Sequence, residues 1–470
     1  MRSKNHTAIS LHEEDYHMIR RNFLKLGSAS MFLKASGLRA LPQAAADKDA
    51  PHVSSFYQPM IWPSTPPADI PFSQSDLLKG IRFTGRHKEY TEYTDADTWF
   101  PTWAQDGDLY SPFEDGSVNV PGGGKIEADG AQGRKATQGY AKIIGSDPLN
   151  LSIVPLGKQS ASALPFSGRY ACANLNYNGI WYYGTYCCDV PSRTVDGIFF
   201  SWASLEPFVG FKVSRDYGKT WEDTPHTPWS PLFPEVADRS AALKALAEQD
   251  RDWRTSDVRS IIHGLPQVKI GTPHFVDFGR NMEHSPDGKA YLVGHGTVEP
   301  DPKPRFANNN WIAGDQLFIV RVTPTPSSIN DTSQYEHFAG LDAQGRPAWS
   351  REFSKIQPLV DWNNHCGCVT ITFNSPLRKY LMCVADPWPG TREINTFILE
   401  SSDIGGPWKL VTYMTKFGEQ GYFVNIPTKF ISEDGRKCWL CYSANYTEAK
   451  FKVNPPGGIY SLCLHEFELL

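Results

Sequence analysis

Five similar aromatic-rich passages, each divided by a turn, predict an all-β fold: a five-bladed β-propeller of four-stranded antiparallel blades, with one short helical insertion. Composition supports this prediction. Aromatic residues make up 13% of the 470 residues, and the chain holds 38 Gly and 36 Pro. Aromatic side chains favour strands, whereas Gly and Pro favour the tight turns between strands. The 40% hydrophobic content is ample for a packed core.

Each passage has a polar start, an apolar strand, a turn and a second strand. The clearest turn is Asn178-Gly179, because Asn-Gly between alternating apolar runs is a strong hairpin signal. The passages span residues 97–111, 173–186, 274–295, 368–384 and 423–443. Outer strands are expected at 210–214, 317–322, 396–401 and 458–462. Two hairpins per unit make a four-stranded blade, and five such blades close a propeller.

Two long stretches interrupt this pattern, at about 116–165 and 222–265. We interpret both as insertions between strands. The second contains an Ala- and Leu-rich segment from Arg239 to Arg251 that predicts the single helix.

The N-terminal segment resembles a twin-arginine export signal. Residues 19–25 read IRRNFLK, an apolar stretch follows at 26–41, and three alanines at 44–46 suit a signal peptidase. The alternative is a short amphipathic helix at a cytoplasmic N-terminus. The resemblance implies a signal peptide at 1–46 and a periplasmic or secreted protein. We expect an N-terminal extension at 47–79 and the propeller at 80–470.

Charge limits the partners to be expected. The formal net charge is −5, and removing residues 1–46, with seven basic and three acidic side chains, would change it to −9. An acidic body without a basic stripe argues against nucleic acid. No segment has the apolar length of a membrane span. A neutral or weakly charged ligand, such as an oligo- or polysaccharide, fits better. The oligomeric state is left open.

The nine cysteines have no regular spacing and are odd in number, so they do not form a disulfide framework. We expect small buried thiols. Cys187-Cys188 is expected as two free thiols rather than a vicinal disulfide. Cys438 and Cys441 would point to opposite faces of a strand, which disfavours a shared zinc ion. No metal or cofactor is predicted, although an axial Ca²⁺ would be compatible with the fold.

Two motifs carry a resemblance to known families. Residues 214–221 read SRDYGKTW and match the Asp-box pattern of sialidase-like propellers, in which Asp216 bonds turn amides and Trp221 packs between sheets. Residues 97–110, with Asp97 before an aromatic strand and DGDLY at 106–110, resemble the first blade of five-bladed glycoside-hydrolase propellers. The nearest group comprises bacterial domains of mostly unknown function, some related to endo-D-arabinanases. This resemblance implies glycan cleavage at a central cleft.

Glycoside hydrolysis needs a proton donor and a second carboxylate. The resemblance implies that Asp97 is the general base, although an aspartate bonding turn amides fits equally well. The general acid is expected from the third blade or later, and three residues qualify: Glu283, Asp315 and Glu419. Each could instead be structural.

Substrate contacts are expected from polar and aromatic residues near the ends of the inner strands. These candidates are Asp95, Trp99, Asn176, His284, Trp311, Asn363, Asn364 and His365. Two other functions stay open. A polysaccharide lyase would use His284 or His365 with a Tyr beside a uronate, and a non-catalytic glycan-binding propeller would keep the aromatics without an opposed carboxylate pair.

Overall fold

The computed structural model describes residues 55–189, 193–195, 198–200, 204–233, 269–296, 309–388, 393–445 and 453–470. All of them belong to one compact unit. The signal expected in 1–46 and the helix expected from Arg239 to Arg251 lie outside the described residues. The described chain is almost entirely β, which confirms the predicted fold class. Its helical turns are the short 3-10 segments η2 (Gly133–Lys135), η3 (Arg280–Met282), η5 (Thr332–Gln334), η6 (Phe353–Lys355) and η7 (Thr428–Phe430).

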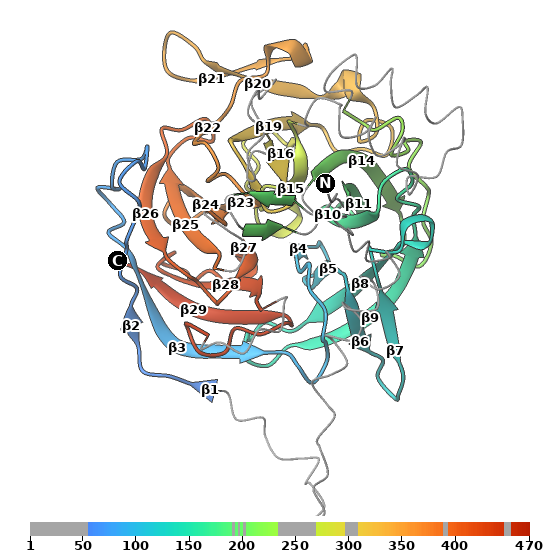
Figure 1. The fold of residues 1–470 in the computed structure, drawn as a ribbon, viewed down its shortest axis with the longest axis horizontal. Helices are drawn as coiled ribbons and strands as arrows, with labels where there is room; N and C mark the ends of the chain where they lie inside the picture. The colour runs from blue at the N-terminus through green and yellow to red at the C-terminus, as the bar shows by residue number, and fades with distance from the viewer. Residues whose placement is uncertain are drawn as a thin grey trace, which may run out of the picture. The chain divides into compact units, whose positions relative to one another are not determined.

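Five antiparallel sheets of the described chain form the blades of a propeller (Figure 1). Blade 1 consists of β4 (Thr102–Trp103), β5 (Leu109–Phe113), β8 (Thr137–Ile144) and β9 (Ser152–Ser160). Blade 2 consists of β10 (Gly168–Tyr177), β11 (Ile180–Asp189) and β14 (Ser204–Ser214). Blade 3 consists of β15 (Gly271–Phe275), β16 (Ala290–Gly296), β19 (Gln316–Val322), β20 (Glu336–Leu341) and β21 (Pro347–Ser350), with β22 (Val360–Asp361) also on β19.

Blade 4 consists of β23 (Val369–Asn374), β24 (Lys379–Asp386), β25 (Asn395–Ser401) and β26 (Lys409–Met414). Blade 5 consists of β27 (Tyr422–Asn425), β28 (Lys437–Ser443), β29 (Cys463–Leu469) and β3 (Ile81–Glu89). Three further pairs are β6 (Gly116–Asn119) with β7 (Lys125–Ala128), β12 (Arg193–Val195) with β13 (Ile198–Phe200), and β17 (Asn309–Asn310) with β18 (Ala313–Gly314).

The described blades differ from the expected pattern in strand number and in strand position. Blade 2 has three described strands and blade 3 has six, where four were expected. The stretch 116–165, expected as an insertion, contains β8 and β9, the outer strands of blade 1. The strand expected at 458–462 is also wrong, since the third strand of blade 5 begins only at Cys463. In both cases the outer strands carry fewer aromatic residues than the inner hairpins, so the repeat is weaker there.

Blade 5 is closed by the two ends of the described chain. Strand β3, from the N-terminal side, pairs antiparallel with β29, the last strand of the chain. In Figure 1 the blue β3 lies beside the red β29. Exposure along β3 alternates strictly over its first seven residues, as a strand with one face in a core requires. The closure therefore joins the ring by backbone hydrogen bonds between segments that are remote in sequence.

The segment before β3 packs along the outside of blades 4 and 5. Strands β1 (Ser55–Phe56) and β2 (Met60–Ile61) pair with the other edge of β3. Farther along, the Thr65 N–H donates to the Tyr413 carbonyl at 3.2 Å, and Gln74 bridges to Leu410 on β26. Covering strand edges in this way removes unpaired backbone groups that would otherwise pair with other chains.

The core lies between adjacent blades. Trp181 and Tyr183 of β11 pack with Tyr110 and Tyr140 of blade 1. Between blades 4 and 5, Phe467 belongs to a cluster that includes residues of both sheets, and it is fully buried. Burying one large apolar side chain contributes about 1.5–3 kcal/mol. The inter-blade layers therefore fix the position of each inner strand.

The turn at 214–221 joins blade 2 to blade 1. Asp216 accepts hydrogen bonds from the Thr220 N–H at 2.8 Å and from the hydroxyls of Thr220 and Ser214. Gly218 has a φ of +89°, which L side chains rarely adopt. The Trp221 ring lies 5.3 Å from the rings of both Tyr140 and Trp181. Asp216 thus organises a turn rather than facing a cleft.

All nine cysteines are buried and unbridged. The expectation of small buried thiols is confirmed, and Cys187 and Cys188 form no vicinal disulfide. Among the described residues, no helix has the length and apolar character needed to cross a membrane.

Candidate active site

The inner strands of the five blades run in the same direction around the axis. Parallel contacts at matched positions show this. Thr370 and Thr372 of β23 donate to the carbonyls of Val424 and Ile426, at 2.8 and 2.7 Å. The Asn174 amide of β10 donates to the Phe100 carbonyl at 2.6 Å. Side chains that precede the inner strands therefore gather at one end of the propeller, which we call the N-terminal end.

An axial pocket lies between these strands, and every blade contributes to its lining. The lining comprises Phe100, Pro101, Asn174, His274, Phe275, Asp277, Thr370, Ile371, Thr372, Asn425 and Ile426. Its volume is about 40 Å³, room for a few water molecules rather than a sugar ring. Most of its polar side chains already bond neighbouring blades, as Asn425 does through its amide to the Trp99 carbonyl at 2.9 Å. The polar side chains of the pocket therefore join neighbouring blades to one another.

Asp97 lies at the N-terminal end of blade 1, with 7% of its surface exposed. Its Oδ2 accepts a hydrogen bond from the Tyr422 hydroxyl at 2.7 Å, and its Oδ1 accepts one from the Thr98 hydroxyl at 2.7 Å. Hydrogen bonds from hydroxyls favour the ionised form of a carboxyl group. Asp97 is therefore oriented by Tyr422 of blade 5 as well as by Thr98 of its own blade.

Trp311 brings an aromatic surface to the same place. Its ring meets the ring of Tyr422 edge-on at 5.8 Å and the ring of Phe423 at 5.7 Å. Trp311 is only half-buried. Tyr422 therefore connects two of the residues predicted from the sequence, because it donates to Asp97 and contacts Trp311.

The turn before β27 contains the third predicted residue at this end, Glu419. Several residues of this turn have left-handed backbone conformations: Lys416, Gly418, Glu419 and Gln420. Such conformations cost energy in residues other than glycine and cluster at functional sites. Burial, reinforced by the negative charge of Glu393 and opposed by Lys416, raises the pKa of Glu419. Glu419 is half-buried, so its carboxyl group can still exchange protons with solvent or ligand.

Asp315 and Asn364 lie together, but in a structural arrangement. Asp315 is fully buried, and its Oδ1 accepts from the Asn364 N–H at 2.9 Å. Asn364 has a φ of +69°, which this bond helps to hold. The neighbouring Asn363 is exposed. Asp315 thus braces the loop that leads into β23.

His365 forms a buried pair with a carboxylate that sequence reasoning missed. Its Nδ1 lies 2.7 Å from Asp386 Oδ2, and the Tyr413 hydroxyl donates to the same oxygen at 2.5 Å. The His365 ring stacks on Trp362 at 4.1 Å. Because Asp386 ends β24 while His365 precedes β23, only the folded hairpin brings them together. The pair orients the imidazole, as a carboxylate does for a catalytic or a structural histidine.

Glu283 and His284 lie at the other end of the propeller. They follow β15, in the turn that leads to β16. Their neighbour Arg280 reaches the Gln105 carbonyl in the turn after β4. The Glu283 and His284 side chains are exposed by 51% and 38%, with 3.8 Å between Oε1 and Nε2. The structure therefore does not bring them together with Asp97.

Three other predicted substrate contacts serve packing or local structure. Trp99 is 1% exposed, donates to the Ala96 carbonyl and stacks with Phe113 in the core. Asn176 is fully buried in blade 2. Asp95 is exposed, and its Oδ1 accepts from the N–H and the hydroxyl of Ser117. A polar or aromatic residue at the start of a strand does not by itself reveal the direction in which its side chain points.

Glu114 is the other residue that sequence reasoning missed. It pairs with Asp97 through two backbone hydrogen bonds of 3.0 Å, which places both side chains on the same face of the ladder. Glu114 is fully buried, and its Oε1 accepts from the Ala171 N–H. Burial, with smaller contributions from Asp115 and Asp97, raises the pKa of Glu114 well above its usual range. Burial therefore favours the neutral form of the Glu114 carboxyl group, which lies next to Asp97 in the ladder.

No protein-family model and no curated protein sequence matches this chain. Among solved structures, it is similar to a GH43_1 enzyme from Xanthomonas citri, with 12% identity over 81% of this chain and 89% of that one and a TM-score of 0.38. It is also similar to a family 117 glycoside hydrolase from Zobellia galactanivorans, with 10% identity, 84% and 90% coverage and a TM-score of 0.37. The catalytic domain of a GH62 alpha-L-arabinofuranosidase from Coprinopsis cinerea gives 11% identity, 88% and 97% coverage and a TM-score of 0.35.

Proposed function

We propose that this protein is a glycoside hydrolase whose active site lies at the N-terminal end of the inner strands. One observation carries the proposal: the Asp97 carboxylate is held by the Tyr422 hydroxyl, and the same tyrosine contacts the half-buried Trp311 ring. A carboxylate beside a half-buried aromatic ring suits a sugar, whose ring faces are apolar and whose edges carry hydroxyl groups.

In this proposal Asp97 is the base or nucleophile and Glu419 the proton donor. The two hydroxyl bonds support an ionised, oriented Asp97. The raised pKa of Glu419 supports the donor role, because a general acid must keep its proton near working pH. Glu114 would act behind Asp97 as a neutral carboxyl group, since it is fully buried.

We further propose that the twin-arginine pathway exports the protein, and that its substrate is an oligo- or polysaccharide outside the cytoplasm. The support is the IRRNFLK sequence at 19–25 and the acidic remainder of the chain. A periplasmic or secreted location would give the enzyme access to glycans of other cells.

The test is a turnover screen of the protein against plant, algal and mycobacterial glycans. Asp97→Asn and Glu419→Gln should each lower the release of reducing sugar by about 10²–10⁴-fold, the usual contribution of a general acid or base. Glu283→Gln is the matched control, because it removes a candidate carboxylate at the other end of the propeller. Circular dichroism establishes that each variant is folded.

Each alternative predicts a different result. Loss of activity in Glu283→Gln alone would refute the proposed site and move it to the opposite end. Unsaturated products that absorb in the near ultraviolet would identify a lyase. Glycan binding without any product would leave a recognition propeller and refute the enzymatic proposal. For an active hydrolase, the anomer released first reports the carboxylate separation, about 5–5.5 Å for retention and 6.5–9.5 Å for inversion.

A further inference from the structure

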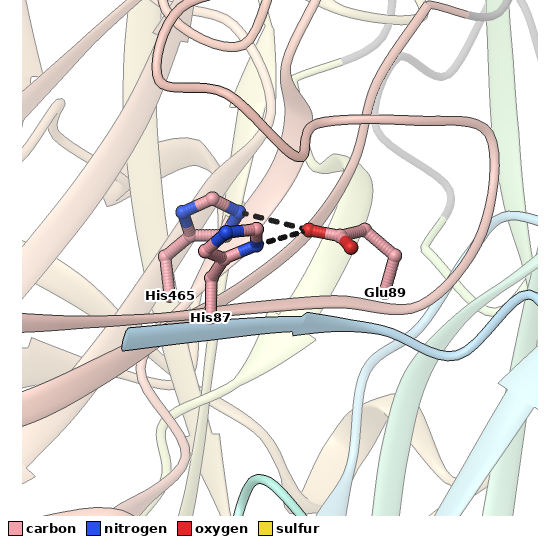
Figure 2. A group of neighbouring side chains, drawn as sticks. All are labelled: His87, Glu89 and His465. Atoms are coloured by element: carbon pink, nitrogen blue, oxygen red, sulfur yellow. Dashed lines mark hydrogen bonds and ion pairs between the residues drawn. The ribbon is translucent and has the colours of Figure 1, made fainter. Parts of the chain in front are cut away.

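Two histidines and a glutamate meet where the ring is closed. His87 and Glu89 lie on β3, and His465 lies on β29 directly opposite His87. Residues 87 and 89 share one face of their strand, because side chains alternate along a strand. Opposite residues of an antiparallel pair share that face as well. The register of the closure therefore gathers all three side chains, as Figure 2 shows.

The ligand atoms of this group form a compact set. One nitrogen of each imidazole and one oxygen of Glu89 lie within 4.8 Å of one another. His87 Nδ1 is 2.5 Å from Glu89 Oε1, and His465 Nε2 is 3.8 Å from the same oxygen. The two imidazole rings stack at 4.9 Å between centroids. The three ligand atoms thus lie close together on one side of the closure.

The group is buried, and one of its atoms lacks a partner. His465 is fully buried and His87 is 4% exposed, while the Glu89 side chain is 18% exposed. His465 Nε2 makes no hydrogen bond. Leaving a buried nitrogen unpaired costs free energy, and a ligand at this point would remove that cost. The unpaired nitrogen is aimed at Glu89, the third member of the group.

We propose that His87, Glu89 and His465 bind a zinc ion that locks strand β3 to strand β29. Two imidazoles and one carboxylate are a known donor set for zinc, with a water molecule in the fourth position. Zinc–ligand bonds of about 2.0–2.2 Å in a tetrahedron place the donor atoms about 3.3–3.5 Å apart. The separations of 2.5 and 3.8 Å lie on either side of this range. Because the two imidazoles stack with 21° between their planes, one ring would have to turn on zinc binding for both nitrogens to point at the ion.

The surroundings fit a metal site. Gly457 has a φ of +100°, and a Cβ there would lie 2.0 Å from Glu89 Oε1 and 2.4 Å from His87 Nδ1. The loop backbone therefore covers the group closely. The Tyr57 hydroxyl lies 3.5 Å from His465 Nδ1, at the nitrogen that would not bind the metal, where an orienting partner is expected.

The position of these three residues in the fold indicates a structural role for the proposed zinc ion. The group lies on the third and fourth strands of blade 5, away from the inner strand β27. Asp97, Trp311 and Tyr422 are not part of it. A zinc ion here would join the first blade strand of the chain to its last and stabilise the closed ring, whether or not the protein hydrolyses glycans.

The experiment uses the full chain, expressed without a polyhistidine tag in zinc-supplemented medium. Mass-spectrometric metal analysis should find about one zinc per chain. Removing it with a chelator should lower the melting temperature, and adding zinc, but not magnesium, should restore it. Cobalt substitution should give the visible absorption of a four-coordinate ion.

Variants then locate the ion. Glu89→Gln and His87→Gln should weaken zinc binding by more than about 100-fold, since even outer-shell changes cost 10–100-fold. His337→Gln is the matched control, because His337 is also buried on an outer strand but bonds only the Ser350 carbonyl. Equal zinc binding by Glu89→Gln and the wild type would overturn the proposal. So would a wild-type protein that carries no zinc and gains no thermal stability from it, a result that does not depend on whether the variants fold.

Discussion

Acid should destabilise this propeller through one buried histidine, His274. Its ring stacks on Phe100 at 3.8 Å, and neither ring nitrogen has a hydrogen-bond partner. Burial, with a smaller contribution from His295, lowers the pKa of His274 from 6.5 to about 3. The folded protein thus holds the neutral imidazole, whereas the unfolded chain takes up a proton near pH 6.5.

The sign and size of the effect follow from these two pKa values. Between pH 6.5 and about 3 the unfolded state binds more protons than the folded state, so stability falls as the pH falls. Each pKa unit corresponds to about 1.4 kcal/mol. At pH 4, which is about 2.5 pH units below the pKa of the histidine in the unfolded chain, protonation stabilises the unfolded chain by about 3 kcal/mol. His274 should therefore lower the free energy of unfolding by about 3 kcal/mol relative to pH 7.

Urea denaturation of the wild type and of His274→Leu, repeated in steps from pH 7.5 to pH 4, measures this contribution. The variant should lose about 3 kcal/mol less than the wild type over that range, whatever other groups contribute, because they are common to both. His284→Gln, a change of an exposed histidine at the end of the propeller, is the control. An identical loss in His274→Leu and the wild type would refute the reasoning.

Three further outcomes are expected. Tyr422→Phe removes the hydroxyl group that donates to Asp97. The variant should lower kcat/KM by about 10-fold, which corresponds to about 1.4 kcal/mol. Unchanged kinetics on the active substrate would contradict the role of Asp97. Asp216→Ala removes the acceptor that holds the 214–221 turn, so the melting temperature should fall by a few degrees while turnover stays the same. Phe467→Ala opens a cavity at the ring closure and should lower the free energy of unfolding by about 3–5 kcal/mol, as measured by urea denaturation. A loss below about 1 kcal/mol would mean that the packing of β29 does not stabilise the closed ring.

The inner hairpins could be predicted because their turns are specified locally. In the structure Asn178 and Gly179 have φ values of +52° and +75°, the left-handed pair that an Asn-Gly turn between two strands requires. The flanking strands β10 and β11 pair in the register that this turn sets. The number of blades follows from counting such hairpins. Local chemistry was therefore sufficient for the inner half of each blade.

Burial and direction of side chains could not be predicted in the same way. Glu114 follows an apolar strand and carries no motif, yet folding buries it beside Asp97 and raises its pKa. Trp99 stands two residues after Asp97 but turns into the core. Which of two nearby residues faces the axis depends on backbone irregularities, such as the φ of +67° at Thr98. These are settled by packing between blades, which one strand's sequence does not contain.

The pairing that closes the ring could not be predicted from the sequence of one strand either, and the zinc experiment tests it. The alternating pattern of β3 marks it as a strand, but its partner β29 lies at the other end of the chain. The register between them includes an irregularity after His465, between the pairs at His87 and Phe83. A slip of one residue would carry His465 to the opposite face, away from Glu89, because side chains alternate. Zinc binding that depends on His465 of β29 as well as on His87 and Glu89 of β3 would therefore establish the register between the two strands.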